Sequence, residues 1–138
     1  MTTISQIRAG IETRLQTLDT IRVTQEFIGP LPVSGNASVA VVEYAGATYD
    51  TAFGGQGDAL NFGIVVLASK LSDRAGVAKL DDLCDPTSGS VTSVRTAVNG
   101  KLGGIVTDAA VRTSSGYQEY AVDEQKYLGV EFVVEVQT

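Results

Sequence analysis

The sequence predicts an α+β fold in which a mostly antiparallel β-sheet packs against an N-terminal helix and two central helices. Near the N-terminus, apolar residues recur every three or four positions, which is typical of a helix. Near the C-terminus they alternate with other residues, which is typical of a strand. Two shorter helical patterns lie between further apolar runs. A chain of 138 residues has the usual length of one domain, so we expect a single domain over 1–138.

The first predicted element is a helix over 4–18. Its apolar face consists of Ile4, Ile7, Ile11, Leu15 and Leu18. Thr3 is a suitable N-cap, because a hydroxyl can accept a hydrogen bond from a free amide of the first turn. Asp19 and Thr20 end the helix, and the β-branched residues that follow predict a first strand over about 21–28.

The segment 29–36 is predicted to be a loop, because its prolines cannot donate a hydrogen bond to a sheet. Two apolar strands follow over 39–44 and 60–69, and we expect them to pair as a long hairpin. The glycine-rich segment 48–58 forms the hairpin tip, since glycine tolerates tight turns. A phosphate-binding loop is the alternative, but the segment lacks both the GK[ST] ending and a following helix.

Two helices are predicted in the middle of the chain. The first runs over 73–83 with Ser72 as its N-cap, and a proline shortly after it prevents its continuation. The second runs over 91–98 with Ser90 as its N-cap, and Asn99-Gly100 supplies a left-handed stop.

Three strands are predicted after these helices. Strands over 105–113 and 117–123 flank Ser114-Ser115-Gly116, which indicates a second hairpin. The last strand begins at Leu128 and continues to the end of the chain. Its apolar face consists of Leu128, Val130, Phe132, Val134 and Val136. Burial of that face makes the C-terminal strand part of the core.

The composition excludes several kinds of site. Histidine is absent, which removes the commonest general base and the commonest transition-metal ligand. The single cysteine, Cys84, allows neither an intramolecular disulfide nor a cysteine-based zinc site. Asp81, Asp82 and Asp85 form an acidic cluster without the ligand spacing of a calcium loop. We therefore expect no catalytic residue, no cofactor and no metal.

The charge pattern argues against membranes and against tight nucleic-acid binding. No apolar run approaches the roughly 20 residues of a membrane helix. Residues 1–10 lack the basic-then-apolar pattern of a leader, so we expect neither membrane insertion nor secretion. The net charge is −6, and residues 117–138 carry one basic and five acidic residues. Glu131 and Glu135 lie about 13 Å apart along one strand, too far apart for a glycosidase carboxylate pair. They are interpreted as a solvated or subunit-facing stripe.

Several stretches in order suggest one known family. They are ISQIRAGIETRLQTL, VAVVEY, YDTAFGGQGDALNFGIVVLASKLSDRAGVAKLDDL, LGGIVTDAAV and EYAVDEQKYLGVEFVVEVQT, and together they cover nearly the whole chain. With the proline-containing loop between the first two, this order resembles the tail-terminator family of long-tailed bacteriophages (siphophages). Members of this family in phages of actinobacteria are also described as head-to-tail connector or neck proteins.

The resemblance implies an α+β subunit that forms a ring, by analogy a homo-hexamer, at the head-proximal end of a completed tail tube. The ring would stop tube polymerisation and join the tail to the head, in the neck of a virion assembled in the host cytoplasm. Its partners would be other copies of itself, the tail tube protein and head-completion or connector proteins, while genomic DNA passes through without specific binding. Another neck or head-completion protein is the alternative. The resemblance implies no catalysis, cofactor or membrane.

The candidate contacts come from physical reasoning about loops and charge. Protruding loops are the natural contacts with a tube end, and irregular segments rich in glycine or proline are not expected in a core. The predicted loop contacts are Leu31, Val33, Tyr49, Phe53, Gly54, Gly55, Gly57 and Asp58. Glu131 and Glu135 are expected to face the bore of the ring or a neighbouring subunit, where carboxylates would repel DNA phosphates. Neighbouring copies would pair through edge strands or dock the first helix.

Overall fold

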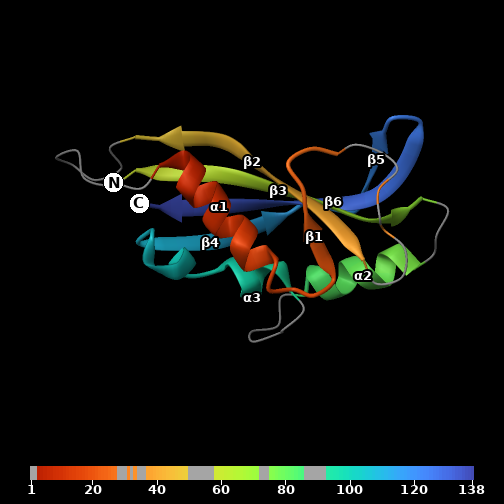
Figure 1. Ribbon diagram of the computed structural model, residues 1–138, viewed down its shortest axis with the longest axis horizontal. Helices are drawn as coiled ribbons and strands as arrows, with labels where there is room; N and C mark the ends of the chain where they lie inside the picture. The colour runs from red at the N-terminus through yellow and green to blue at the C-terminus, as the bar shows by residue number, and fades with distance from the viewer. Residues whose placement is uncertain are drawn as a thin grey trace.

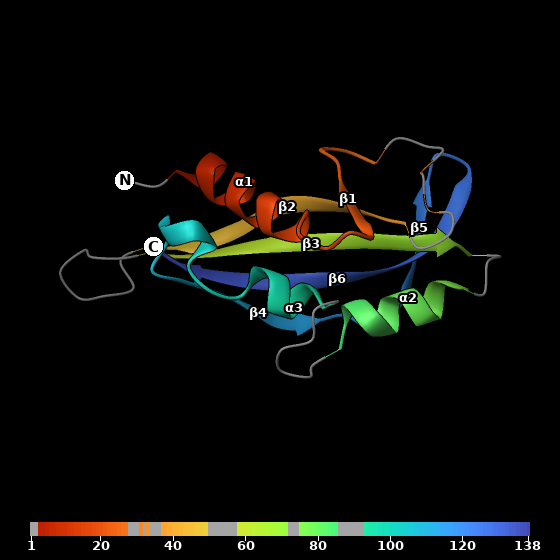
Figure 2. The ribbon, with the colours of Figure 1, turned by 60° about the horizontal axis from the view of Figure 1, so that its bottom comes forward.

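The sheet and the helices lie in two layers. The computed structural model describes residues 3–27, 31, 33, 37–49, 58–71, 75–85 and 93–138. Within them, six strands form one sheet in the order β1-β2-β3-β6-β4, and β5 also pairs with β6. The helices α1, α2 and α3 cover one face of this sheet (Figures 1 and 2). The predicted α+β class with a mostly antiparallel sheet is confirmed.

Helix α1 spans Ile4–Leu15 and begins where the sequence predicts. The Thr3 hydroxyl accepts a hydrogen bond from the amide of Gln6 at 3.1 Å, and the Gln6 side chain accepts one from the amide of Thr3 at 2.9 Å. This reciprocal capping box confirms the predicted N-cap. The residues buried against the sheet are Ile7, Ile11 and Leu15. Leu18 lies beyond the end of the helix and is still buried, whereas Ile4 is 37% exposed.

The first strands form a parallel pair and a long hairpin. β1 spans Ile21–Val23, shorter than predicted, and pairs in parallel with the start of β2, which spans Ser38–Thr48. β2 pairs antiparallel with β3, which spans Ala59–Lys70, so the predicted hairpin is confirmed. Parallel neighbours need a crossover connection, and the chain between Val23 and Ser38 provides it.

The two predicted central helices are present, and α3 starts later than predicted. α2 spans Ala75–Leu83, and its predicted cap at Ser72 lies outside the described residues. α3 spans Val94–Val98. Its N-cap is Ser93, and not the predicted Ser90, because the Ser93 hydroxyl accepts a hydrogen bond from the third amide of the helix at 3.1 Å.

The strand predicted to begin at residue 105 begins later. After α3 the chain turns at Gly100, with φ of +126°, and again in the 3₁₀ turn η1, Leu102–Gly104. Gly103 and Gly104 have φ of +77° and +95°, which strand residues do not adopt. β4 therefore begins only after this turn and spans Asp108–Ser114.

The second predicted hairpin, across Ser114-Ser115-Gly116, is wrong. β4 and β5 (Gln118–Val122) do not pair with each other, and both pair antiparallel with β6 (Gln125–Gln137) on the edge away from β3. In the segment between β4 and β5, the amide of Ser115 donates a hydrogen bond to the Glu131 carbonyl at 2.8 Å. The Ser115 hydroxyl accepts one from the Glu131 amide at 3.0 Å. The segment is therefore a break in one long edge strand. The true hairpin joins β5 to β6 through a turn in which Asp123 has φ of +54°.

The sheet separates two apolar clusters. The larger cluster lies under the helices and contains Val130, Phe132, Val134 and Val136 of β6, so the predicted register of the last strand is confirmed. The intervening residues of the strands face the other way. They contribute to a second cluster, which consists of Leu31, Val33, Val39, Val65, Leu67, Val122 and Tyr127. In the described part of the chain, none of the helices has the length and apolar character needed to span a membrane.

Gly129 is required where β6 passes between β3 and β5. A Cβ at this position would lie 2.5 Å from the Val66 carbonyl oxygen and 2.6 Å from Leu67 Cδ2. We expect Gly129→Ala to lower the free energy of unfolding by about 1–3 kcal/mol, because the added methyl group overpacks the sheet. Gly116→Ala is the control, since nothing lies within 4 Å of a Cβ there. Chemical denaturation measures both variants, and equal stability would contradict the close approach at Gly129.

Candidate interaction surface

The structure describes the two ends of the predicted tube-contacting loop. Tyr49 follows β2 and is 68% exposed. A side-chain hydrogen bond with Tyr49 is the largest cause of the raised pKa of Tyr44 in β2. At the other end, the amide of Asp58 donates to the Thr138 hydroxyl at 2.9 Å, which ties the loop to the C-terminus. The remaining predicted contacts, Phe53, Gly54, Gly55 and Gly57, lie outside the described residues.

The prediction that Leu31 and Val33 are exposed contacts is wrong. They are only 8% and 4% exposed, and they pack around the fully buried Tyr127. The amide of Leu31 donates to the Tyr127 hydroxyl at 3.2 Å, and the Val33 carbonyl accepts from Lys79 Nζ at 2.8 Å. An irregular, proline-flanked segment can be buried when its backbone polar groups find such partners. Leu31 and Val33 therefore belong to the second apolar cluster.

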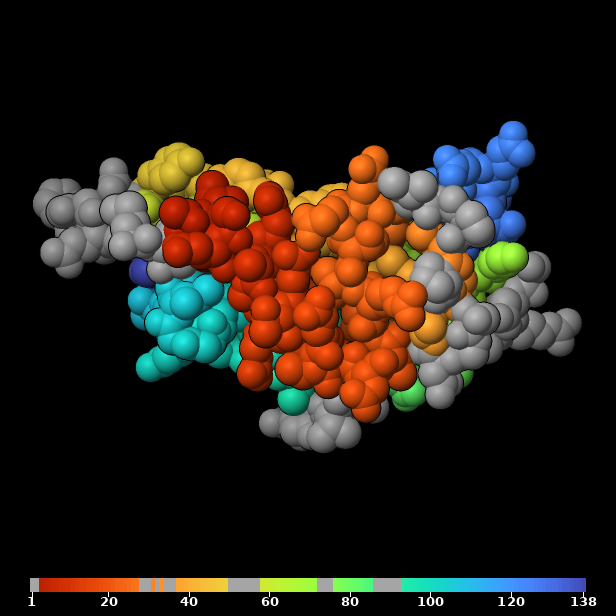
Figure 3. All heavy atoms as spheres, in the orientation of Figure 1, coloured from red at the N-terminus to blue at the C-terminus, as the bar shows by residue number. Residues whose placement is uncertain are grey.

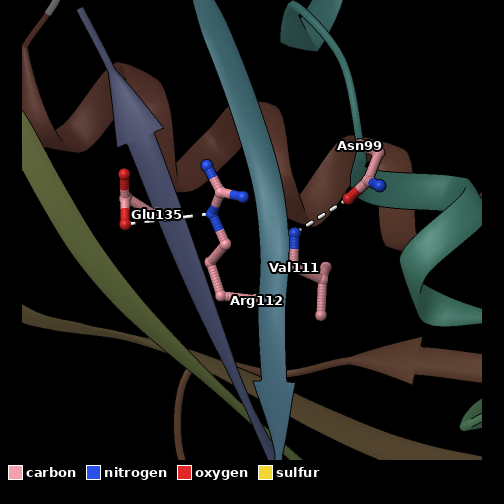
Figure 4. Close-up of polar contacts among 4 residues, drawn as sticks. All are labelled: Asn99, Val111, Arg112 and Glu135. Atoms are coloured by element: carbon pink, nitrogen blue, oxygen red, sulfur yellow. Dashed lines mark hydrogen bonds and ion pairs between the residues drawn. The ribbon is translucent and has the colours of Figure 1, made fainter.

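Glu131 and Glu135 are exposed on the sheet face opposite the helices. Glu135 forms an ion pair with Arg112 of β4, with 3.9 Å between Oε2 and Nε, and both side chains are about half exposed (Figure 4). On the other side of β4, the Val111 amide donates to Asn99 Oδ1 at 2.8 Å (Figure 4). The negative charge of the predicted stripe formed by Glu131 and Glu135 is therefore partly neutralised at Glu135. Its orientation toward a bore or a neighbouring subunit stays a prediction.

Two residues that sequence reasoning missed lie on the same face. Glu43 of β2 is exposed. It directly follows the buried Val42, so the two side chains lie on opposite faces of the sheet. Tyr120 of β5 has a raised pKa, chiefly because it is partly buried, and Glu131 and Glu43 raise the pKa further by repelling the phenolate charge. The alternation along β2 is the signal that could have identified Glu43. We call Glu43, Glu131 and Glu135 the carboxylate face.

Within the described strands, β2 has an outer edge that is open beyond Ala40; this stretch is called the open β2 edge. β1 pairs only with Ser38–Ala40. The amide of Thr24 donates to the Ala40 carbonyl at 2.9 Å, so the polar backbone groups of Ala40 point away from β3. The backbone N–H and C=O groups of successive strand residues point to alternate edges. The backbone groups of Val42 and Tyr44 therefore also point away from β3. Among the described strands, none pairs with this edge beyond Ala40, and Figure 1 shows β2 along the upper border of the molecule.

Tyr117, Asp81 and Cys84 form a polar cluster where α2 meets the break between β4 and β5. The Tyr117 hydroxyl donates to Asp81 Oδ1 at 2.5 Å. The pKa of Tyr117 is raised. Burial is the largest cause, and this hydrogen bond is the second. Burial also raises the pKa of the Cys84 thiol. We interpret the cluster as a structural contact that holds the edge strand to α2.

We expect Tyr117 to ionise at higher pH than an ordinary tyrosine. An unfolded tyrosine ionises near pH 10, so the stabilisation from this group is complete below about pH 10 and is lost as the pH rises above it. Alkaline titration, followed by tyrosinate absorbance, measures this ionisation. The Tyr117→Phe variant should show one late-ionising tyrosine fewer than the wild type. In Asp81→Asn, Tyr117 should ionise earlier than in the wild type, because the charged acceptor is gone. Identical curves for all three proteins would refute the assignment.

The described residues thus offer two distinctive surfaces, the open β2 edge that leads to Tyr49 and the carboxylate face on the other side of the sheet from the helices. In the described part of the chain, no group of three or more His, Cys, Asp or Glu residues could hold a metal ion. Comparisons with protein-family models and with curated proteins find no match.

Proposed function

We propose that this protein is a structural subunit of a phage tail. It forms a ring, by analogy with the tail-terminator family a hexamer, on the head-proximal end of the tail tube. The ring stops the addition of tube subunits and carries the contacts that join the tail to the head. Its sequence pattern motivates this proposal, and the α+β fold agrees with the fold that the resemblance implies.

The open β2 edge is the observation that carries the proposal. A subunit that caps a growing polymer must offer the polymer end a bonding surface. The edge presents the backbone polar groups of Val42 and Tyr44, and it leads directly to the exposed Tyr49. Such an edge binds a strand of another protein through main-chain hydrogen bonds, while side chains beside it supply specificity. We therefore assign the tube contact to this edge and to the start of the 48–58 loop.

The carboxylate face fits the passage of DNA through a ring. Glu43 and Glu131 lie on the sheet face that carries no helix, together with the Glu135–Arg112 ion pair. Carboxylates that line a bore repel phosphates and keep DNA from adhering. In this arrangement the helices lie on the outside of the ring.

Electron microscopy of phage particles made without this protein tests the proposal. We expect overlong tubes without heads, because nothing ends polymerisation. Complementation with the wild type should restore tail length, whereas Tyr49→Ala should restore it only in part. Gln118→Ala, an exposed change on β5, is the matched control and should behave as the wild type. Filled heads without tails would favour a head-completion protein instead, and tails of normal length joined to heads would overturn both assignments.

A further inference from the structure

An open groove lies between α1 and η1. It has a volume of about 610 Å³, and its apolar lining includes Ala9, Gly10, Leu102 and Ile105. Gly10 permits the close approach of the two elements, because a Cβ there would lie 2.8 Å from Ile105 Cδ1. Ile105 is nevertheless 37% exposed, so this apolar surface is accessible to a partner.

The lining of this groove includes one basic residue, Arg14. Arg14 is exposed, and its Nε donates to the Ala97 carbonyl at 2.9 Å. This hydrogen bond holds the guanidinium group beside the groove. Lys101, also exposed, directly precedes Leu102. The groove therefore suits a partner that presents an apolar side chain next to a carboxylate.

The tip of the β5–β6 hairpin has these properties. Leu71, just after β3, is 44% exposed, and its amide donates to the Lys126 carbonyl at 3.0 Å, which holds it against the hairpin. Asp123 and Glu124 form the exposed turn. Lys126, which lies beside Glu124, forms an exposed ion pair with Glu119 at 3.0 Å. The tip thus presents an apolar side chain beside carboxylates.

The groove and the hairpin tip lie toward opposite ends of the molecule. Figures 1 and 2 both place α1 and η1 toward the end where the chain termini lie, and the β5–β6 hairpin at the other end. Figure 3 shows the red α1 surface beside the cyan η1 segment, with the blue hairpin at the far end. Two unlike surfaces at opposite ends can join successive copies head to tail, and such contacts form a ring when the rotation closes.

We propose that the β5–β6 hairpin tip, with Leu71 beside it, docks into the α1–η1 groove of a second copy of this chain. In this contact Leu71 enters the apolar groove and Glu124 faces Arg14. The proposal rests on the proposed function, because it names the contact between neighbouring copies of the ring. The docking itself can be tested on the purified protein.

Cysteine cross-linking tests this contact. In a Cys84→Ser background, Thr13→Cys is placed in one chain and Gln125→Cys in another, and the two are mixed at high concentration under mild oxidation. We expect a disulfide between the two chains. In the matched control, the second chain carries Thr48→Cys in place of Gln125→Cys. Thr48 is exposed at the end of β2, and this pair of chains should form far fewer disulfides. Equal linking of the two pairs, or no linking, overturns the docking.

A charge exchange gives the second readout. Adding Arg14→Glu to the first chain, or Glu124→Arg to the second, should reduce the yield of cross-linked pairs by about five- to tenfold, because like charges would face each other. Combining both changes should restore the yield, and failure of that rescue also overturns the contact. If linking fails while particles without the protein still grow overlong tubes, the docking is wrong and the capping function stands. If linking succeeds while such particles are normal, the capping function is wrong.

Discussion

Phe132→Ala is expected to lower the free energy of unfolding by about 3–5 kcal/mol. Phe132 is 2% exposed in the larger apolar cluster. Its strand pairs on one side with β3, where Ile64 lies opposite it, and on the other side with β4, where Ser114 lies opposite it. Strands on both sides limit how far the backbone can move to fill the cavity, so the cost should lie in the upper part of the range for such deletions.

The control for this prediction is Glu131→Lys, on the same strand but on the exposed face. The backbone amide of Glu131 makes its hydrogen bond whatever the side chain, so we expect a change within about 0.5 kcal/mol. Equilibrium denaturation with comparison of the m-values measures both variants and also reports whether the unfolding remains two-state. A similar loss of stability in the two variants would show that the faces of β6 are assigned wrongly.

Lys79→Met is expected to lower the free energy of unfolding by about 2–4 kcal/mol. The Lys79 ammonium group donates to the carbonyl oxygens of Val33, Ala37 and Ala68 at 2.8, 3.1 and 2.7 Å. It therefore connects α2 to the end of β3 and to the chain that covers the second apolar cluster. Hydrogen bonds to a charged donor contribute more than neutral ones, and methionine keeps the length of the side chain while it removes the donor.

Lys126→Met is the matched control for Lys79. Lys126 forms an ion pair with Glu119 at 3.0 Å, but its side chain is 63% exposed. An exposed ion pair of this kind contributes about 0–1 kcal/mol. Hydrogen exchange of the Val33 amide, which donates to the Leu31 carbonyl at 2.9 Å, should accelerate in Lys79→Met and not in Lys126→Met. Equal effects of the two substitutions would contradict the connecting role of Lys79.

The regular elements with their own periodicity could be predicted from the sequence. The Thr3 cap and the apolar face of β6 were correct, and so was the buried face of the first helix except for Ile4, which is 37% exposed. Each depends on residues within one or two turns, or on strict alternation along one strand. The same reasoning assigned the α3 cap to the wrong serine, because helix ends depend on which of several suitable residues meets the first free amides.

The candidate surface was less predictable. Glu131 and Glu135 are exposed as expected, since they take the polar positions of an alternating strand. Leu31 and Val33 are buried instead, because Tyr127 and Lys79 supply the polar partners that this irregular segment needs. Both partners lie far away in the sequence, so no local pattern shows that they meet. Composition alone suggested a loop and could not show which side of the sheet that loop covers.

The sequence by itself determined the α+β class, the first helix with its cap and the buried face of the last strand, because these follow from interactions between residues close together in the chain. Only the tertiary structure decided that β4 and β5 share one edge of β6, that β2 keeps an open edge, and that the groove and the hairpin tip lie toward opposite ends. Those features depend on hydrogen-bond pairing and packing between distant segments, for which a single sequence carries no local signal.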